Sequence, residues 1–262
     1  MSVIVLDDQV VHYEVLGRGQ PVVFLHSWVG SWRYWIPAMQ GVSISFRAYA
    51  LDLWGFGDTA KDTSRYSLNE QLKLLEGFLV EMGIQRCALV GHGLGAVLAL
   101  LFARRKPEAV DRVMAVSLPL EKAALNPNLE STNLADLLEW AVSKDPALNP
   151  VRGEILKTDP QALQSSMSEM SQDDIWDLAT RTAANLVLVH GQNDPLIREP
   201  REEQVADLPE QAHALVFEQS GHFPMLEESN KFNRLLIEFL NLKSGESPRQ
   251  LQLKEEWKRR VR

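Results

Sequence analysis

Three short segments of this chain carry residue types that could do acid–base or nucleophilic chemistry. The first is a glycine-rich turn at 91–95, between two apolar runs. The second holds Asp194, directly after another apolar run, and the third holds His222, which follows the run at 214–217. A carboxylate and an imidazole suit proton transfer. Taken alone, each also has a structural interpretation, because turn aspartates and loop histidines are common.

The apolar runs predict the strands that position these segments. Short continuous apolar runs bounded by turns are typical of strands buried on both faces. Such strands are expected at 21–25, 48–51, 87–90, 110–116, 186–190 and 214–217. Helical patterns fall between them, which indicates a parallel sheet covered on both faces, preceded by a hairpin at 3–16. Residues 119–185 show helical patterns and no convincing strand, so they are predicted to form an insertion over the sheet.

The order of these landmarks resembles the α/β-hydrolase family. Its G-x-S-x-G nucleophile elbow is matched at 91–95, except that Gly93 replaces the central serine. The family's histidine–glycine loop is matched at His26, and its D-x-x-G-x-G-x-S turn at 52–59. Its acid and its base fall at Asp194 and His222, in the family's order. The resemblance covers about residues 1–240.

The resemblance implies an α/β fold with a mostly parallel, eight-stranded sheet, helices on both faces and a helical cap. The hydrolase core would comprise 1–118 and 186–240, and the cap 119–185. Residues 241–262 form a basic tail with seven Lys or Arg against three Glu, a net +4. Leu253, Trp257 and Val261 are spaced as one stripe of a helix, so the tail is either a solvated helix or a docking element for a partner or another subunit.

The resemblance also assigns roles at the site. Asp194 and His222 would be the catalytic acid and base, and the backbone N–H groups of Trp28 and Leu94 would form the oxyanion hole. Each such donor is typically worth about 3 kcal/mol of transition-state stabilisation. Because these donors belong to the backbone, the loss of serine does not remove them. Gly93 occupies the nucleophile position and supplies no side chain.

Further residues are expected around the site and are named together: His26, Ser27, Trp32, His92 and Ser117. Ser27 replaces the glycine usual after that histidine and is the nearest alternative hydroxyl, but it does not stand on an elbow, so the sequence favours it less as a nucleophile. Tryptophans gather in the loops at the expected pocket mouth. With the apolar insertion they indicate a small apolar ligand or substrate.

No metal site or cofactor is expected. His26 and His190 each end a strand but have no third ligand at suitable spacing. The glycines at 91–95 lack the G-x-G-x-x-G spacing of a dinucleotide-binding turn.

Three functions stay open from the sequence. The chain could be a hydrolase inactivated at Gly93, with ester hydrolysis as the original activity. It could use His222 to activate a water placed in the space that the missing serine side chain leaves, which would permit one-step hydrolysis or a lyase or isomerase proton transfer. It could also be a binding or scaffold protein that uses the same pocket.

The amino-acid composition narrows the classes of protein to which this chain could belong. The chain has 262 residues, 45% hydrophobic and 24% charged, which is ordinary for a soluble globular protein. A net charge of −8 gives no support for nucleic-acid binding. One cysteine, Cys87, excludes an internal disulfide. The sequence shows no apolar run long enough to span a membrane, and a cytoplasmic location is expected.

Overall fold

One eight-stranded sheet organises the protein. The computed structural model describes residues 2–130, 133–170, 175–243 and 245–253. The strand order is β1-β2-β4-β3-β5-β6-β7-β8, with β1–β2 and β2–β4 antiparallel and the other pairs parallel. This confirms the predicted fold class. The strands are β1 (Ser2–Leu6), β2 (Gln9–Gly17), β3 (Gln20–Leu25), β4 (Phe46–Leu51), β5 (Cys87–His92), β6 (Val110–Val116), β7 (Asn185–Gly191) and β8 (Ala212–Phe217).

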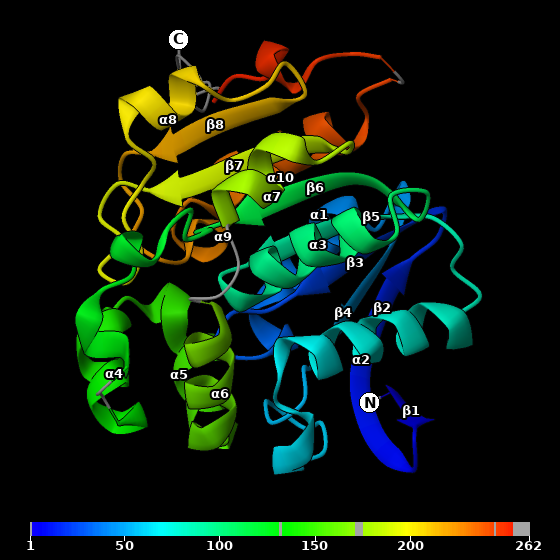
Figure 1. The fold of residues 1–262 in the computed structure, drawn as a ribbon, viewed down its shortest axis with the longest axis vertical. Helices are drawn as coiled ribbons and strands as arrows, with labels where there is room; N and C mark the ends of the chain where they lie inside the picture. The colour runs from blue at the N-terminus through cyan, green and yellow to red at the C-terminus, as the bar shows by residue number, and fades with distance from the viewer. Residues whose placement is uncertain (1, 131–132, 171–174, 244, 254–262) are drawn as a thin grey trace, which may run out of the picture.

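Helices cover both faces of the sheet (Figure 1). On one face α1 packs against α10, and on the other α3 packs against α2 and α7. The α-helices are α1 (Ile36–Val42), α2 (Leu68–Glu81), α3 (Leu94–Arg105), α4 (Leu134–Ala141), α5 (Asn149–Glu154), α6 (Pro160–Met170), α7 (Ile175–Arg181), α8 (Glu202–Ala206), α9 (Pro224–Glu227) and α10 (Ser229–Leu240). Short 3₁₀ turns are η1 (Trp32–Trp35), η2 (Thr63–Arg65), η3 (Lys122–Ala124), η4 (Pro127–Glu130), η5 (Pro146–Leu148), η6 (Ile155–Lys157) and η7 (Pro248–Gln250).

The segment between β6 and β7 divides into two parts. Helices α4, α5 and α6 lie beyond the carboxyl ends of the strands, where a cap over the site is expected (Figure 1). Helix α7 instead lies beside α3 on the sheet face. The structure therefore places only the first part of the predicted insertion, up to Met170, over the strand ends.

Burial follows the sequence pattern that predicted the elements. Every residue of β5 is buried, as a continuous apolar run between two sheet neighbours requires. In α10 the buried residues recur at helical spacing, which gives an apolar face against the sheet. The start of the tail also packs on the core through Leu251, which is buried. The predicted stripe at Trp257 and Val261 lies outside the described residues.

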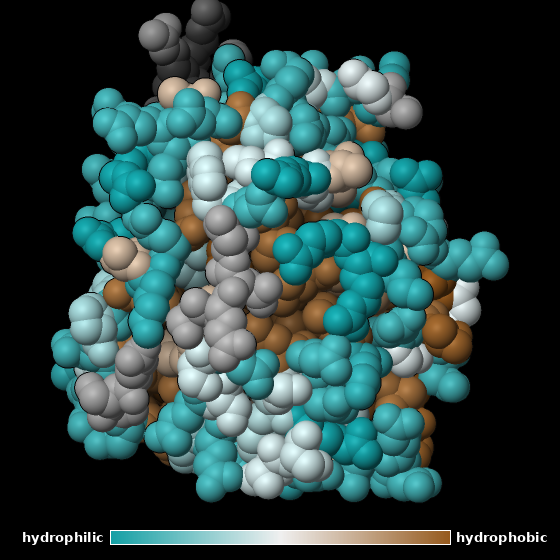
Figure 2. Space-filling view, in the orientation of Figure 1, coloured by the Kyte–Doolittle hydropathy of each residue, from teal (hydrophilic) through white to brown (hydrophobic). Residues whose placement is uncertain are grey.

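The face seen in Figure 2 is largely hydrophilic, and its apolar side chains gather in the middle, over α3 and beside the cap helices. Among the described residues, no helix is both long enough and apolar enough to cross a membrane.

Candidate active site

The loops that follow five parallel strands meet at one edge of the sheet. Strands β3, β5, β6, β7 and β8 run in the same direction, so their carboxyl ends lie together. The loop after each strand carries one residue expected at the site: Ser27, Gly93, Ser117, Asp194 and His222. The topology thus brings together residues that lie up to 195 positions apart in the chain.

The turn between β5 and α3 has the tight geometry of an elbow. Gly93 adopts φ +50° and ψ −111°, a conformation that disfavours side chains. A Cβ on Gly91 would lie 2.2 Å from the carbonyl oxygen of Gly95, and a Cβ on Gly95 would lie 2.3 Å from the carbonyl oxygen of Leu25. Strand and helix can therefore meet this closely only with glycine at both positions.

Asp194 and His222 form a buried pair. His222 Nδ1 lies 2.8 Å from Asp194 Oδ2, and both side chains are 1% exposed. The same carboxylate oxygen accepts a hydrogen bond from Ser117 Oγ, while Oδ1 accepts the backbone N–H groups of Leu196 and Ile197. Burial opposes ionisation of Asp194, but the attraction of His222 and these hydrogen bonds hold the pKa of its carboxyl below the ordinary value. The arrangement fixes Nδ1 of the imidazole as donor and leaves Nε2 free to accept a proton.

The Nε2 atom of His222 faces Ser27. Ser27 Oγ lies 3.4 Å from it, and Ser27 is fully buried. Ser27 Oγ also lies 2.2 Å from the place where a Cβ on Gly93 would stand. The space beside Gly93, where one of the three hypotheses places a water, is therefore occupied by the Ser27 hydroxyl. That hypothesis considered position 93 without its neighbour across the turn.

Three buried side chains hold the backbone of Ser27. Its N–H donates to the hydroxyl of Tyr34 at 2.7 Å, and that hydroxyl lies 3.0 Å from His92 Nδ1. Its carbonyl lies 2.7 Å from His26 Nδ1, while His26 Nε2 accepts the N–H of Leu53 at 3.0 Å. Burial lowers the pKa of both histidines, so both rings are neutral near pH 7. Both nitrogens of His26 are used in these contacts and His92 Nδ1 faces Tyr34, so both histidines position the loop.

Two backbone N–H groups lie next in the chain to positions 27 and 93, which face each other across the turn. Trp28 follows Ser27, and Leu94 follows Gly93 as the first residue of α3. Within the described residues, the N–H of neither Trp28 nor Leu94 has a hydrogen-bond acceptor. Unpaired N–H groups at the start of a helix are suited to a negative oxygen.

The site is closed by the cap in this structure. Trp28 is 2% exposed, and its indole Nε1 donates to Ser166 Oγ on α6 at 3.0 Å. The buried Glu154 of α5 accepts hydrogen bonds from Ser31 Oγ at 3.1 Å and Arg33 Nε at 3.0 Å. The cap is thus tied by specific polar contacts to the loop that carries Ser27.

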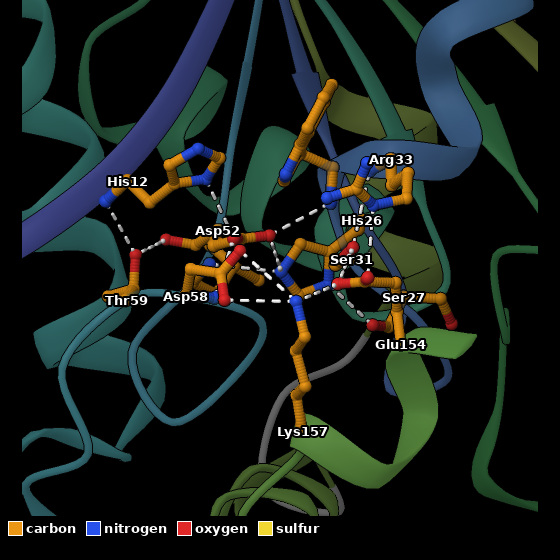
Figure 3. A network of polar contacts seen from close by, with 12 residues as sticks. His12, His26, Ser27, Ser31, Arg33, Asp52, Asp58, Thr59, Glu154 and Lys157 are labelled. Atoms are coloured by element: carbon orange, nitrogen blue, oxygen red, sulfur yellow. Dashed lines mark hydrogen bonds and ion pairs between the residues drawn. The ribbon is translucent and has the colours of Figure 1, made fainter. Parts of the chain in front are cut away.

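A polar network organised around Asp52 lies beside that loop (Figure 3). Asp52 accepts the N–H of Trp32 at 2.9 Å and lies 3.0 Å from His12 Nδ1. The Trp32 ring packs against His12, with 5.5 Å between ring centroids, so the structure places this predicted pocket residue in the network and not beside Gly93. Lys157 reaches from the cap to Asp58 at 3.0 Å.

The same network contains one group of side chains, among the described residues, whose spacing could hold a metal ion: His12, Asp52 and Asp58. The protein's own contacts already use these side chains, because Asp52 Oδ2 accepts the N–H of Asp58 and lies 3.0 Å from His12 Nδ1.

The tryptophans predicted at the pocket mouth are buried instead. Trp35, for example, packs against Phe24 in the core.

Sequence reasoning missed three residues that position the site. Tyr34 anchors Ser27, Ser166 receives the Trp28 indole, and Glu227 Oε2 accepts the N–H groups of Gly221 and Phe223 on either side of His222. Burial raises the pKa of Glu227 against the opposing effect of those two N–H groups. The spacing of an acid five residues after the histidine was visible in the sequence, and Tyr34 lies only seven positions after Ser27. The Trp28–Ser166 contact joins residues 138 positions apart and gave no local signal.

A model of the alpha/beta hydrolase family matches residues 22–235, and the chain belongs to this family. Among curated relatives, a 2-hydroxy-6-oxo-2,4-heptadienoate hydrolase of Pseudomonas putida is 26% identical over 255 residues, covering 86% of this chain and 90% of that protein. A pimeloyl-[acyl-carrier protein] methyl ester esterase of Vibrio cholerae is 23% identical over 253 residues, covering 87% and 97%.

Solved structures show the same fold. A meta-cleavage product hydrolase from Pseudomonas fluorescens IP01, as an S103A mutant, superposes with a TM-score of 0.79 at 22% identity, over 92% of this chain and 97% of that one. An enol-lactonase from Burkholderia xenovorans LB400 gives a TM-score of 0.80 at 17% identity, over 92% and 100%.

Proposed function

We propose that this protein hydrolyses a small, largely apolar ester or a related acyl bond without a cofactor. In this proposal His222 is the general base and Asp194 orients it. The observation that carries the proposal is the buried Asp194–His222 contact of 2.8 Å, with Nε2 facing Ser27 Oγ at 3.4 Å in the loop after β3. Relatives named as a methyl ester esterase and as a heptadienoate hydrolase support the reaction class.

The residues divide the work in a defined way. His222 Nε2 takes a proton from the attacking oxygen and later returns it to the leaving group. Asp194, whose pKa is lowered, stays ionised and stabilises the imidazolium. The N–H groups of Trp28 and Leu94 would receive the oxyanion of the tetrahedral intermediate, at about 3 kcal/mol for each donor.

An apolar groove beside Asp194 supports the substrate class. It has a volume of about 760 Å³ and lies between the start of the cap and the loop after β7. Its apolar walls include Leu125, Leu129, Met167 and Ile197. In the proposal the apolar part of the substrate occupies this groove, and the cap moves to admit the scissile bond to His222.

A second candidate is a binding protein without turnover. The observation that favours it is the closure of the site, because Ser27 is fully buried and His222 is 2% exposed. Such a protein would keep its affinity for an apolar ester or acid when His222 is replaced, whereas an enzyme would lose its rate.

Hydrolysis of short- and medium-chain aryl esters by the wild type, His222→Ala and Asp194→Asn tests the proposal. Loss of the base should lower kcat by about 10²–10⁴-fold. The control is His213→Ala, which removes an imidazole from β8 that contacts the Leu251 carbonyl instead of the site. Turnover that is equal in His222→Ala and the wild type, or absent throughout while an ester still binds, would refute hydrolysis by this pair.

A further inference from the structure

We propose that Ser27 is the nucleophile, so that the attacking hydroxyl has moved from the elbow to the loop after β3. This inference rests on the proposed function and adds the residue that forms the covalent intermediate. The hydroxyl and the glycine have changed places. Position 93 carries glycine, and position 27, across the turn, carries the serine.

The side chains of these two positions share one space. A Cβ at position 93 would stand 2.2 Å from Ser27 Oγ and 3.0 Å from Ser27 Cβ. A serine at 93 together with the present Ser27 would therefore collide. One hydroxyl fits, and in this chain it comes from Ser27.

Ser27 Oγ is also in the correct relation to the base. It lies 3.4 Å from His222 Nε2, its hydrogen-bond partner among the described residues. Because His222 Nδ1 is bound to Asp194, Nε2 is the acceptor and the serine hydroxyl is the donor. The distance is longer than an ideal hydrogen bond, as is common before substrate binds.

The oxyanion donors keep their relation to the moved hydroxyl. In an elbow, one donor is the N–H of the residue after the nucleophile and the other comes from the facing loop. Leu94 follows position 93, and Trp28 follows position 27. With serine at position 27, the donor that follows the nucleophile is the N–H of Trp28, and the donor from the facing loop is the N–H of Leu94. Both donors remain in place.

The backbone under Ser27 is held without strain. In the described chain, positive φ angles at non-glycine residues occur at Asp7, Asp8 and Ser117, so Ser27 has an ordinary φ. Two hydrogen bonds fix the loop instead: the Ser27 N–H donates to the Tyr34 hydroxyl, and His26 Nδ1 donates to the Ser27 carbonyl. The elbow strain is taken by Gly93, which tolerates it.

The reaction balances with groups that are present. Ser27 Oγ bonds to the acyl carbon as its proton passes to His222 Nε2, and the carbonyl π pair moves to the oxygen. The intermediate collapses, the bond to the alcohol oxygen breaks, and His222 gives that oxygen its proton. Water then attacks the acyl-serine with His222 as base, and Ser27 Oγ leaves with the proton, which yields acid and alcohol.

A fluorophosphonate probe tests the assignment without knowledge of the substrate. It phosphonylates activated serine by forming a P–O bond and releasing fluoride. We expect one adduct, mapped by peptide mass spectrometry to Ser27, and a loss of labelling rate of about 10²-fold or more in His222→Ala. Ser43→Ala, which removes a hydroxyl at the end of α1 that donates to the Gln40 carbonyl, should label like the wild type. No adduct at Ser27 overturns the assignment.

The exchange variant gives a second, independent outcome. Ser27→Gly should abolish labelling, and Ser27→Gly combined with Gly93→Ser should restore it with the adduct at position 93. Ester turnover separates the two proposals. Turnover that needs His222 but survives in Ser27→Ala overturns the nucleophile and leaves the hydrolase intact. A Ser27 adduct with no ester turnover supports the nucleophile and refutes ester hydrolysis.

Discussion

The stability of Gly93→Ala, measured with and without Ser27, follows from the geometry of the shared space. A methyl group at position 93 would lie 2.2 Å from Ser27 Oγ and 3.2 Å from Trp28 Cε3. Overpacking of this kind costs about 1–3 kcal/mol, and a side chain at this φ and ψ costs about 1–3 kcal/mol more. We therefore expect Gly93→Ala to lower the free energy of unfolding by about 2–6 kcal/mol.

In the Ser27→Gly background the collision with Oγ is absent and the backbone strain remains. Gly93→Ala should then be less costly by about 1–3 kcal/mol, the overpacking part. Urea denaturation of the wild type, both single variants and the double variant gives this coupling directly. A coupling within about 0.5 kcal/mol of zero would show that the side chains at positions 27 and 93 do not compete for space.

Three further predictions concern residues around the site. Tyr34→Phe leaves the buried N–H of Ser27 unpaired and should lower the free energy of unfolding by about 1–3 kcal/mol in urea denaturation. Burial would lower the pKa of His12, but the hydrogen bond and charge of its buried aspartate raise it above the ordinary value. Protonated His12 therefore stabilises the fold fully at pH values below its ordinary pKa, and this stabilisation is lost as the pH rises through the raised pKa. His12→Gln should remove this part of the pH dependence of the free energy of unfolding. An unchanged dependence on pH would contradict the prediction. Glu227→Ala should lower kcat several-fold at constant KM, because the loop that carries His222 loses the acceptor of its Gly221 and Phe223 N–H groups.

The sequence was sufficient for the elements whose signal is local. The apolar run of β5 and the glycines at 91 and 95 predicted a sheet strand and the elbow, because each depends on a short stretch of chain. The pairing of Asp194 with His222 was implied by the resemblance to the α/β-hydrolase family.

The features that could not be predicted from the sequence depend on contacts between distant segments. Ser27 and Gly93 are 66 positions apart, and nothing local shows that their side chains would share one space. The tryptophans present the same difficulty, since a loop tryptophan at a pocket mouth and one buried beneath it have the same local pattern. Only packing distinguishes Trp28, tied to the cap, from Trp32, which lies against His12.

Peptide mapping of the protein quenched in acid during turnover of an aryl ester shows whether Ser27 forms the covalent intermediate. We expect an acyl group on the peptide that contains Ser27, in the wild type but not in His222→Ala. Steady turnover with no acyl group on any peptide at early or late times would contradict it, because the attacking oxygen would then be that of water.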